Sequence, residues 1–433
     1  MQRLDAGAAD FAERFDALVN ARREAGKDVA DAVRDIIGRV RDEGDVALAD
    51  LTARFDSHNL DETGWQVTVE EMDAALEGLP KDLRAALELA AERIATYHEK
   101  QRPEDRDEVD AAGVRLGARW SAVDAAGLYV PGGRAAYPSS VLMNAIPAKV
   151  AGVERIVIVT PTPGGEINPL VLAAAKIAGV TEMWRVGGAQ AIAALAYGTD
   201  KILPVDVIVG PGNAWVAEAK RQLYGVVGID MVAGPSEIVV VADAQNDPEW
   251  IAADLLSQSE HDPSSQSILF TDDACFSGNV ATAVERQIPL LDTAKVARES
   301  WDDNGAIITV ASLDEAMPLV NRLAPEHLEL AVDDPDALFA KVRHAGSVFM
   351  GRMTPEAVGD YVAGPNHVLP TGRRARFSSG LSVLDFMKRT SFIALDKKAL
   401  EHIGPAAVAL ARAEGLPAHA NSVANRLSAA GEK

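Results

Sequence analysis

Short, nearly uninterrupted runs of Val and Ile constrain the fold of this chain more than any other feature of its sequence. They include IVIVT (156–160), VDVIV (205–209), EIVVV (237–241) and AIITV (306–310), with MWRV (183–186), SILF (267–270) and SVFM (347–350) in the same rhythm. Ala-rich stretches such as NPLVLAAAKIAG and AIAALAYG lie between them. Strands that helices bury on both faces need continuous apolar runs, whereas half-exposed strands alternate. The sequence therefore predicts an α/β fold with parallel sheets.

The two ends of the chain have a helical pattern. Apolar residues of 29–40 recur on one helical face, and 83–97 continues as a long helix rich in Ala, Leu and Glu. The charged stretch RPEDRDEVD (102–110) is interpreted as a solvated connector. A further helical stretch, 395–413, is followed by a polar tail. This C-terminal segment is too short to fold alone, so we expect it to pack on the body of the protein or on a partner subunit.

The composition argues against several classes of protein. The 433 residues include 64 acidic and 42 basic ones, which gives a formal net charge of −22. This charge disfavours nucleic acid or an anionic membrane as a partner, because both require clusters of Lys and Arg. The single cysteine, Cys275, excludes an intrachain disulfide. No apolar run approaches the ~20 residues of a membrane span, and the N-terminus lacks the apolar core of a signal peptide, so we expect a cytoplasmic enzyme.

Glycine turns with a polar residue follow several of the predicted strands. Their sequences are VGGAQAI (186–192), VGPGNAW (209–215), AGPSEI (233–238) and LYVPGGRAAYP (128–138). Ligands of open α/β sheets bind at the carboxyl ends of strands, where backbone N–H groups and helix N-termini meet them. The side chains that can add directed hydrogen bonds are Gln190, Asn213, Ser236 and Tyr129. The turns can equally be mere connections, and the usual G-x-G-x-x-G fingerprint is absent, so a nicotinamide cofactor would bind in a non-standard way.

Gln258 and His261 form the first candidate pair of metal ligands. They lie in WIAADLLSQSEHDP, a predicted helix whose end is marked by Pro263. A spacing of three residues places both side chains on one helical face, from which they can reach a single metal ion. The same spacing also occurs among surface residues without a ligand, and that interpretation stays open.

Further polar residues of this kind lie in the last part of the chain. Asp360 and His367 flank GDYVAGPNHVLPT, a Gly- and Pro-rich loop of the kind that often carries ligands. His419 follows Glu414 by five residues, near the C-terminus. An N- and O-rich set suited to Zn²⁺ or a similar ion would consist of Gln258, His261, Asp360 and His419.

Glu326 and His327 are adjacent in RLAPEHLELAV, directly before an apolar strand. Pro325 would fix a turn that lets both side chains face one cleft. A carboxylate beside an imidazole provides two groups whose pKa values can be tuned for acid–base chemistry near neutral pH. The pair is the candidate catalytic centre, and the alternative is a capped strand start with a solvated Glu–His pair.

Eight motifs, in this order, resemble those of the histidinol dehydrogenase family: GLYVPGG, VGGAQA, IVGPGNA, AGPSE, SQSEHD, APEHLEL, GDYVAGPNHVLPT and AEGLPAHANS. The resemblance extends over essentially the whole chain. It implies an enzyme that oxidises L-histidinol to L-histidine through histidinaldehyde with two NAD⁺, the last step of histidine biosynthesis, and that holds one Zn²⁺ per subunit. A paralogous zinc- and NAD-dependent dehydrogenase of another polyol or amino alcohol is the alternative, and a non-catalytic protein with the same fold is a further one.

The resemblance also implies roles for individual residues. Glu326 and His327 would be the catalytic acid/base pair. The implied metal ligands are Gln258, His261, Asp360 and His419. The implied substrate contacts are these four ligands together with Ser236, His327, His367 and Glu414. The implied contacts to NAD are Tyr129, Gln190 and Asn213.

The fold implied by the resemblance has two incomplete Rossmann-like α/β domains and small helical segments at both ends. The implied parts are an N-terminal helical segment (1–25), a first, discontinuous α/β domain (26–128 and 238–380), a second α/β domain (129–237) and a C-terminal segment (381–433). The last segment is expected to reach the partner subunit of an intertwined homodimer. Glu414 and His419 would then complete the other subunit's site.

Overall fold

The structure, a computed structural model, describes residues 1–21, 29–132, 137–232 and 234–429 of the chain. Its contacts divide into two units. Unit 1 comprises Met1–Gln101 and Asp124–Phe386, and unit 2 comprises Arg102–Val123 and Met387–Lys433. The predicted domain boundary at residue 25 and parts of two glycine turns, residues 133–136 and 233, lie outside the described residues.

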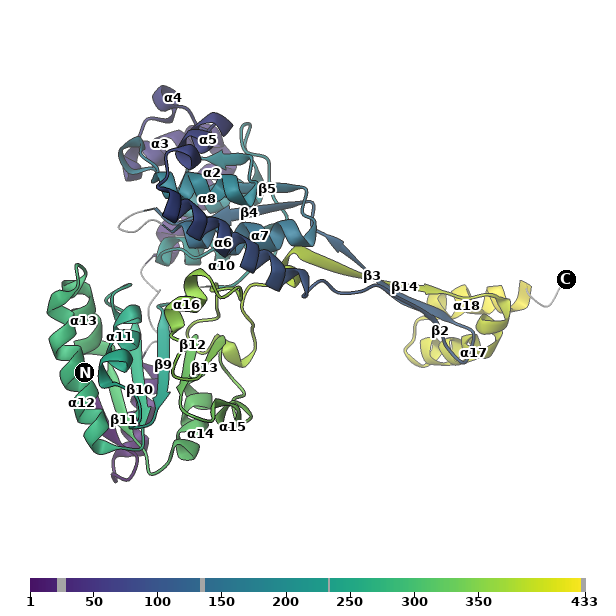
Figure 1. Ribbon diagram of the computed structural model, residues 1–433. Coiled ribbons are helices and arrows are strands. Elements are labelled where there is room, and N and C mark those ends of the chain that lie inside the picture. The colour runs from purple at the N-terminus through teal and green to yellow at the C-terminus, as the bar shows by residue number, and fades with distance from the viewer. Residues whose placement is uncertain (22–28, 133–136, 233, 430–433) are drawn as a thin grey trace. The chain divides into compact units, whose positions relative to one another are not determined.

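Unit 1 contains two parallel sheets, of which sheet A has six strands (Figure 1). In spatial order they are β1 (Gln2–Asp5), β11 (Ala306–Thr309), β10 (Gln266–Thr271), β9 (Glu237–Ala242), β12 (His327–Ala331) and β13 (Ser347–Met350). All neighbouring pairs are parallel. Four of the predicted apolar runs therefore form strands of one sheet.

Helices cover both faces of sheet A, which explains why its strands are continuously apolar. The side chains at 238 and 240 share a core with three helices, α11 (Pro248–Ser259), α12 (Ala274–Gln287) and α13 (Ala294–Asn304). Those at 239 and 241 point the other way and share a core with α1 (Phe11–Asn20) and α14 (Leu313–Leu323). Two short helices, α15 (Pro335–Phe339) and α16 (Glu356–Tyr361), follow β12 and β13.

Sheet B of unit 1 has five parallel strands: in spatial order, β6 (Glu182–Trp184), β5 (Arg155–Val159), β4 (Ala125–Tyr129), β7 (Val207–Val209) and β8 (Gly228–Ile229). The helices of this part are α2 (Ala30–Glu43), α3 (Asp45–Asp56), α4 (Leu60–Thr63), α5 (Val69–Glu77), α6 (Lys81–Glu99), α7 (Pro138–Ala151), α8 (Pro169–Ala178), α9 (Gly188–Tyr197) and α10 (Ala214–Leu223). The predicted apolar face of α2 is buried in one core with Val157 and Val159 of β5. The helices predicted at 29–40 and 83–97 are thus confirmed as α2 and α6.

The two sheets share a strand order with one reversal in each. In sheet B the chain proceeds outward from β4 through β5 to β6, and then returns to the other side of β4 with β7 and β8. Sheet A follows the same pattern from β9, with β10 and β11 on one side, β12 and β13 on the other, and β1 added at the edge. Each sheet is an incomplete form of the doubly wound Rossmann arrangement. The predicted fold class is confirmed, whereas the predicted domain boundaries stay a prediction.

Unit 2 combines two segments that are far apart in the sequence. Its antiparallel sheet has the order β14 (Met387–Ala394), β3 (Arg115–Ala122) and β2 (Arg106–Val109), and it is followed by α17 (Lys397–Ala413) and α18 (Pro417–Ala429). The interpretation of 102–110 as a connector was wrong, because β2 lies within it. The polar tail was also misread, since most of it is α18. All four residues of β2 are exposed, so no apolar alternation in the sequence marks this strand.

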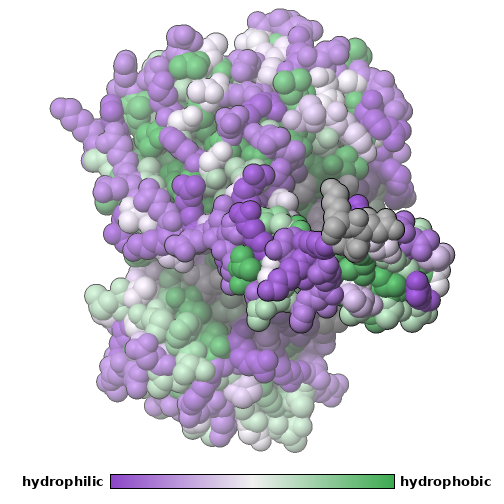
Figure 2. Space-filling view, turned by 90° about the vertical axis from the view of Figure 1, so that its right-hand side faces the viewer, coloured by the Kyte–Doolittle hydropathy of each residue, from purple (hydrophilic) through white to green (hydrophobic). Residues whose placement is uncertain are grey.

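The apolar runs of unit 1 are buried in its cores, and polar residues dominate the visible surface. In Figure 2, hydrophilic side chains cover most of the upper part of the face, with apolar ones in small groups among them. No helix among the described residues is both long and apolar enough to cross a lipid bilayer.

Candidate active site

A cavity of about 340 Å³ in unit 1 brings together most of the predicted site residues. Among the residues that line it are Asn213, Ser236, Gln258, His261, Glu326, His327, Asp360 and His367. They come from segments spread between residues 213 and 367 of the chain, and they lie at strand ends, on helices and in loops.

The cavity lies where ends of both sheets of unit 1 meet. Pro131 and the turn 210–213 follow the carboxyl ends of β4 and β7, the reversal point of sheet B. Ser236 and His327, by contrast, lie at the amino ends of β9 and β12. The cavity residues therefore follow the carboxyl ends of strands in sheet B but lie at the amino ends of strands in sheet A.

The turn at Gly210 shapes the sheet B side of the cavity. Gly210 has a φ of +110°, and a Cβ at this position would lie 2.2 Å from the carbonyl oxygen of Tyr129. A buried ion pair holds the turn, because Lys220 Nζ donates to the Gly210 carbonyl at 2.9 Å and Asp230 Oδ2 accepts from the Gly210 N–H at 2.8 Å. Only glycine fits this close approach of the two strand ends.

Glu326 and His327 are both anchored on the backbone of Glu237, the first residue of β9. The Glu237 N–H donates to Glu326 Oε2 at 3.0 Å, and His327 Nδ1 lies 3.0 Å from the Glu237 carbonyl oxygen. Because a carbonyl can only accept, Nδ1 of the ring carries the hydrogen and Nε2 of the neutral ring keeps its lone pair. Nε2 is buried and has no hydrogen-bond partner among the described residues.

Burial sets the protonation of the pair. The Glu326 and His327 side chains are 9% and 4% exposed. Burial raises the pKa of Glu326 well above its usual value, the Glu237 N–H opposes this, and the neighbouring carboxylates raise it further. Burial lowers the pKa of His327, while the Glu356 carboxylate opposes this shift. Both groups therefore favour their neutral forms: the neutral imidazole can accept a proton at once, whereas the Glu326 carboxyl must first lose its proton before it can act as a base.

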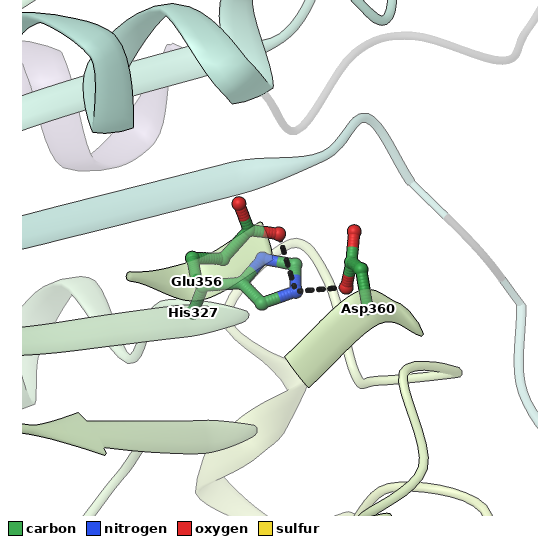
Figure 3. A group of neighbouring side chains, drawn as sticks. All are labelled: His327, Glu356 and Asp360. Atoms are coloured by element: carbon green, nitrogen blue, oxygen red, sulfur yellow. Dashed lines mark ion pairs between the residues drawn. The ribbon is translucent and has the colours of Figure 1, made fainter. Parts of the chain in front are cut away.

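Two carboxylates of the short helix α16 face His327 (Figure 3). Glu356 Oε1 and Asp360 Oδ1 each lie 3.7 Å from His327 Nε2. One ligand atom from each of these three residues lies within 4.8 Å of the others, close enough to hold one cation. The helix approaches β13 because Gly359 has no side chain, and a Cβ there would lie 2.4 Å from the Phe349 ring. Burial raises the pKa of Asp360, and the Glu356 charge adds to this effect.

Gln258 and His261 both line the cavity, but they do not lie on one helix as predicted. Helix α11 ends at Ser259 rather than near Pro263, so His261 lies beyond the helix and its N–H donates to the Gln258 carbonyl at 3.2 Å. Gln258 is fully buried, and its Nε2 donates to Glu356 Oε1 at 2.7 Å. Gln258 Oε1 is buried without a hydrogen-bond partner among the described residues. Both residues nevertheless line the same cavity.

His367 closes another side of the cavity. Its Nδ1 lies 3.0 Å from the Asp360 carbonyl oxygen, and its Nε2 lies 3.4 Å from Ser140 Oγ of α7. Burial lowers the pKa of His367 to about 4, so the ring is neutral near pH 7. The ring can therefore offer or accept a hydrogen bond without carrying a charge.

Of the three residues predicted to contact NAD, Asn213 lines the cavity, whereas Tyr129 and Gln190 do not. Asn213 lines the cavity and also caps α10, where its Oδ1 accepts from the Trp215 and Val216 N–H groups. Tyr129 and Gln190 are 3% and 2% exposed, and the Tyr129 hydroxyl accepts from the Gly188 N–H at 3.1 Å. Neither is among the residues that line the cavity.

Glu414 and His419 belong to unit 2. Glu414 directly follows α17, His419 lies on α18, and both are exposed. Their assignment to the site stays a prediction.

The sequence analysis missed Glu356, which is 1% exposed and contacts both Gln258 and His327. Its spacing of four residues from Asp360 was the signal that could have found it, because such residues share a helical face. A second missed pair is Asp254 of α11 with Glu329 of β12, whose side chains hydrogen-bond each other. Burial raises the pKa of Glu329 to about 9.

Two Rossmann-like sheets, a cavity with a buried Glu–His pair and a group of side chains that could hold a cation are together typical of an α/β enzyme. The chain matches the model of the histidinol dehydrogenase family over residues 19–427, and it belongs to this family. The resemblance of its motifs is thereby confirmed.

Relatives match nearly the full chain. The histidinol dehydrogenase of Zymomonas mobilis subsp. mobilis is 67% identical, covering 98% of this chain and 99% of its own length. That of Rhodospirillum rubrum is 62% identical, covering 98% of each. The crystal structure of histidinol dehydrogenase from Elizabethkingia anophelis has a TM-score of 0.95 at 35% identity, covering 100% of this chain and 99% of that one.

Proposed function

We propose that the chain is an NAD-dependent oxidoreductase that converts L-histidinol to L-histidine through histidinaldehyde with two NAD⁺, the last step of histidine biosynthesis, in the cytoplasm. The names of relatives that are 67% and 62% identical over 98% of the chain support this reaction. Two hydrides leave in succession, so the site needs a base for the alcohol proton and a means of adding water to the aldehyde.

The observation that carries the proposal is the hydrogen bond between His327 Nδ1 and the Glu237 carbonyl. Because Nδ1 carries the hydrogen, Nε2 of the neutral ring keeps a lone pair that can accept a proton. Nε2 is buried at the cavity and has no hydrogen-bond partner among the described residues. In the first oxidation, Nε2 would accept the hydroxyl proton of the alcohol while the carbon that bears this hydroxyl gives up hydride to NAD⁺. A well-placed base of this kind contributes about 10²–10⁴-fold to the rate.

Glu326 is assigned to the second oxidation. Its Oε2 lies 3.8 Å from His327 Nδ1, and burial raises its pKa, which makes the ionised carboxylate a stronger base. It takes a proton from the water that adds to the aldehyde, while protonated His327 returns its proton to the former carbonyl oxygen and becomes neutral again. The hydrated aldehyde then loses its hydride to the second NAD⁺, and His327 accepts the remaining hydroxyl proton.

The residues of the cavity fit a Zn²⁺ ion. Gln258 Oε1 is a buried oxygen without a hydrogen-bond partner among the described residues, and Asp360 adds a partly exposed carboxylate. We assign Gln258, His261, Asp360 and His419 as the ligands, with His419 supplied across a homodimer. Zinc bound there supplies a template for the amino and imidazole nitrogens of the substrate.

The remaining contacts follow from the same assignment. Ser236 and His367 line the cavity and would contact the substrate, and Glu414 would accept from its imidazole across the homodimer. Tyr129, Gln190 and Asn213 are assigned to NAD, and Asn213 is the one of the three that lines the cavity. The C-terminal segment (381–433) would reach the partner subunit, in keeping with the proposed domain division.

The proposal is tested by adding histidinol and NAD⁺ to the zinc-loaded protein and following NADH absorbance. We expect NADH formation that a strong chelator abolishes and added zinc restores. Faster oxidation of another amino alcohol or polyol than of histidinol would contradict the proposed substrate.

A further inference from the structure

We propose that Glu356 is a positioning residue, which fixes the side-chain amide of Gln258 with its oxygen available to the cation. This inference rests on the zinc site of the proposed function and adds a residue to it. Glu356 is the first residue of α16 and is 1% exposed.

Both carboxylate oxygens of Glu356 accept hydrogen bonds from residues of α11. Gln258 Nε2 donates to Glu356 Oε1 at 2.7 Å, and Ser257 Oγ donates to Glu356 Oε2 at 2.9 Å. Gln258 itself is 0% exposed and lines the cavity. Two neighbouring residues of α11 are thus tied to one carboxylate of α16.

The chemistry of the two groups selects one orientation of the amide. Glu356 Oε1 accepts a hydrogen bond of 2.7 Å, and of the two ends of the Gln258 amide only the nitrogen can donate, so the nitrogen faces Glu356. Its oxygen is then turned away, and this oxygen is the buried atom that has no hydrogen-bond partner among the described residues. An unsatisfied buried carbonyl is costly, whereas a bound cation would compensate it.

Glu356 also lies close enough to be considered as a ligand, because its Oε1 is 3.7 Å from His327 Nε2. However, each of its oxygens already accepts a hydrogen bond, from Gln258 or from Ser257. A cation on Oε1 would have to share this oxygen with the Gln258 amide, whereas Gln258 Oε1 has no hydrogen-bond partner among the described residues. The geometry therefore points to orientation of Gln258 rather than to direct ligation.

The substitution E356Q tests this role. An amide at position 356 offers both a donor and an acceptor, so it no longer selects one orientation of Gln258. We expect about 10–100-fold weaker zinc binding, the usual effect of losing a group that orients a ligand. The measurement is competition with a chromophoric chelator, using the full chain. The matched control is E218Q, which replaces a buried carboxylate that accepts a hydrogen bond from Gln222 and does not line the cavity, so it should leave zinc affinity unchanged.

A double substitution, Glu356→Gln with Gln258→Glu, exchanges the two groups. The new amide then donates to the new carboxylate, whose second oxygen remains available to the cation. We expect zinc affinity within about tenfold of the wild type, because the two changes compensate each other. Direct ligation by Glu356 gives no such rescue, because position 356 then carries a neutral amide; a purely structural role is excluded if E356Q loses zinc affinity without losing free energy of unfolding.

The outcomes separate this inference from the proposed function. Wild-type zinc affinity in E356Q overturns the inference, as does a double variant that binds zinc no better than E356Q. If E356Q does not fold, as judged by circular dichroism, the double variant decides: zinc binding within about tenfold of wild type supports the inference, and failure to fold or to bind zinc overturns it. Failure of the proposed function has another signature, since the wild type itself would then bind no zinc or form no NADH from histidinol.

Discussion

His327 donates its Nδ1–H to the backbone carbonyl of Glu237 at 3.0 Å. The N–H of the same Glu237 donates to Glu326 Oε2, also at 3.0 Å. Strands β9 and β12 pair in parallel directly beside these residues, with His327 opposite Ile238. A sheet contact therefore fixes both members of the pair, and neither can rotate without losing a buried hydrogen bond.

The substitution His327→Asn removes the Nε2 base while retaining a polar side chain. We expect kcat for histidinol oxidation to fall by about 10²–10⁴-fold, with a much smaller change in KM. Steady-state kinetics measure both. The control is His402→Asn on α17, an exposed histidine outside the proposed site, which should leave kcat unchanged. Near-normal turnover in the His327 variant would show that another group is the base.

The substitution Glu326→Gln separates the two oxidations. Glutamine has nearly the same shape but cannot take a proton from water, so we expect histidinaldehyde oxidation to fall by about 10²–10⁴-fold. Oxidation of histidinol to the aldehyde should be affected much less. The two substrates are assayed separately, and unimpaired oxidation of the aldehyde would remove Glu326 from its assigned role.

The substitution Gly359→Ala tests how α16 is positioned. A Cβ there would lie 2.4 Å from the Phe349 ring, so α16 must shift and carry Glu356 and Asp360 with it. We expect a loss of about 1–3 kcal/mol in the free energy of unfolding, together with weaker zinc binding. The control is Gly38→Ala in α2, where nothing lies within 4 Å. That change should stabilise the protein by about 0.5–1 kcal/mol, and equal effects at both sites would argue against the packing explanation.

The substitution Glu329→Gln gives a pH-dependent change in stability. Burial raises the pKa of Glu329 from the ordinary 4.5 to about 9, so the folded protein prefers the neutral acid. The stabilisation that the neutral Glu329 side chain gives the folded protein is fully present below about pH 4.5, and it declines as the pH rises toward 9. Glutamine mimics the neutral acid, so we expect similar stability at pH 4.5 and a gain of about 1–3 kcal/mol at pH 8 in the variant. Urea unfolding at both pH values measures this, and a gain confined to low pH would contradict it.

The sequence predicted the layout of unit 1 well because burial on both faces leaves a direct mark on composition. The strand EIVVV and the helix that contains Val33 and Ile36 are apolar wherever the structure buries them. Cavity residues such as Asn213, Ser236 and His327 were also predictable, since each lies beside a strand end. Which end of a strand faces the cavity was not predictable, because it depends on how the two sheets face each other.

Other features depend on contacts that leave little mark on a single sequence. Glu356 looks like a surface residue at a helix start, and its burial arises only from its contact with Gln258 of α11. Strand β14 was missed because its partner is β3, and the paired residues, from Met387 with Ala122 to Ala394 with Arg115, lie 265 to 279 positions apart in the chain. Its mixed polar and apolar residues carry no alternation that identifies it. Pairings of this kind are set by the tertiary fold rather than by local pattern.

The central claim is that one site carries out both oxidations of histidinol. The most direct measurement is the amount of NADH formed per histidinol when histidinol is limiting and the zinc-loaded protein runs to completion, with the product identified by chromatography. We expect two NADH and one histidine for each histidinol consumed. A yield of one NADH with accumulating aldehyde, or no NADH, would contradict it.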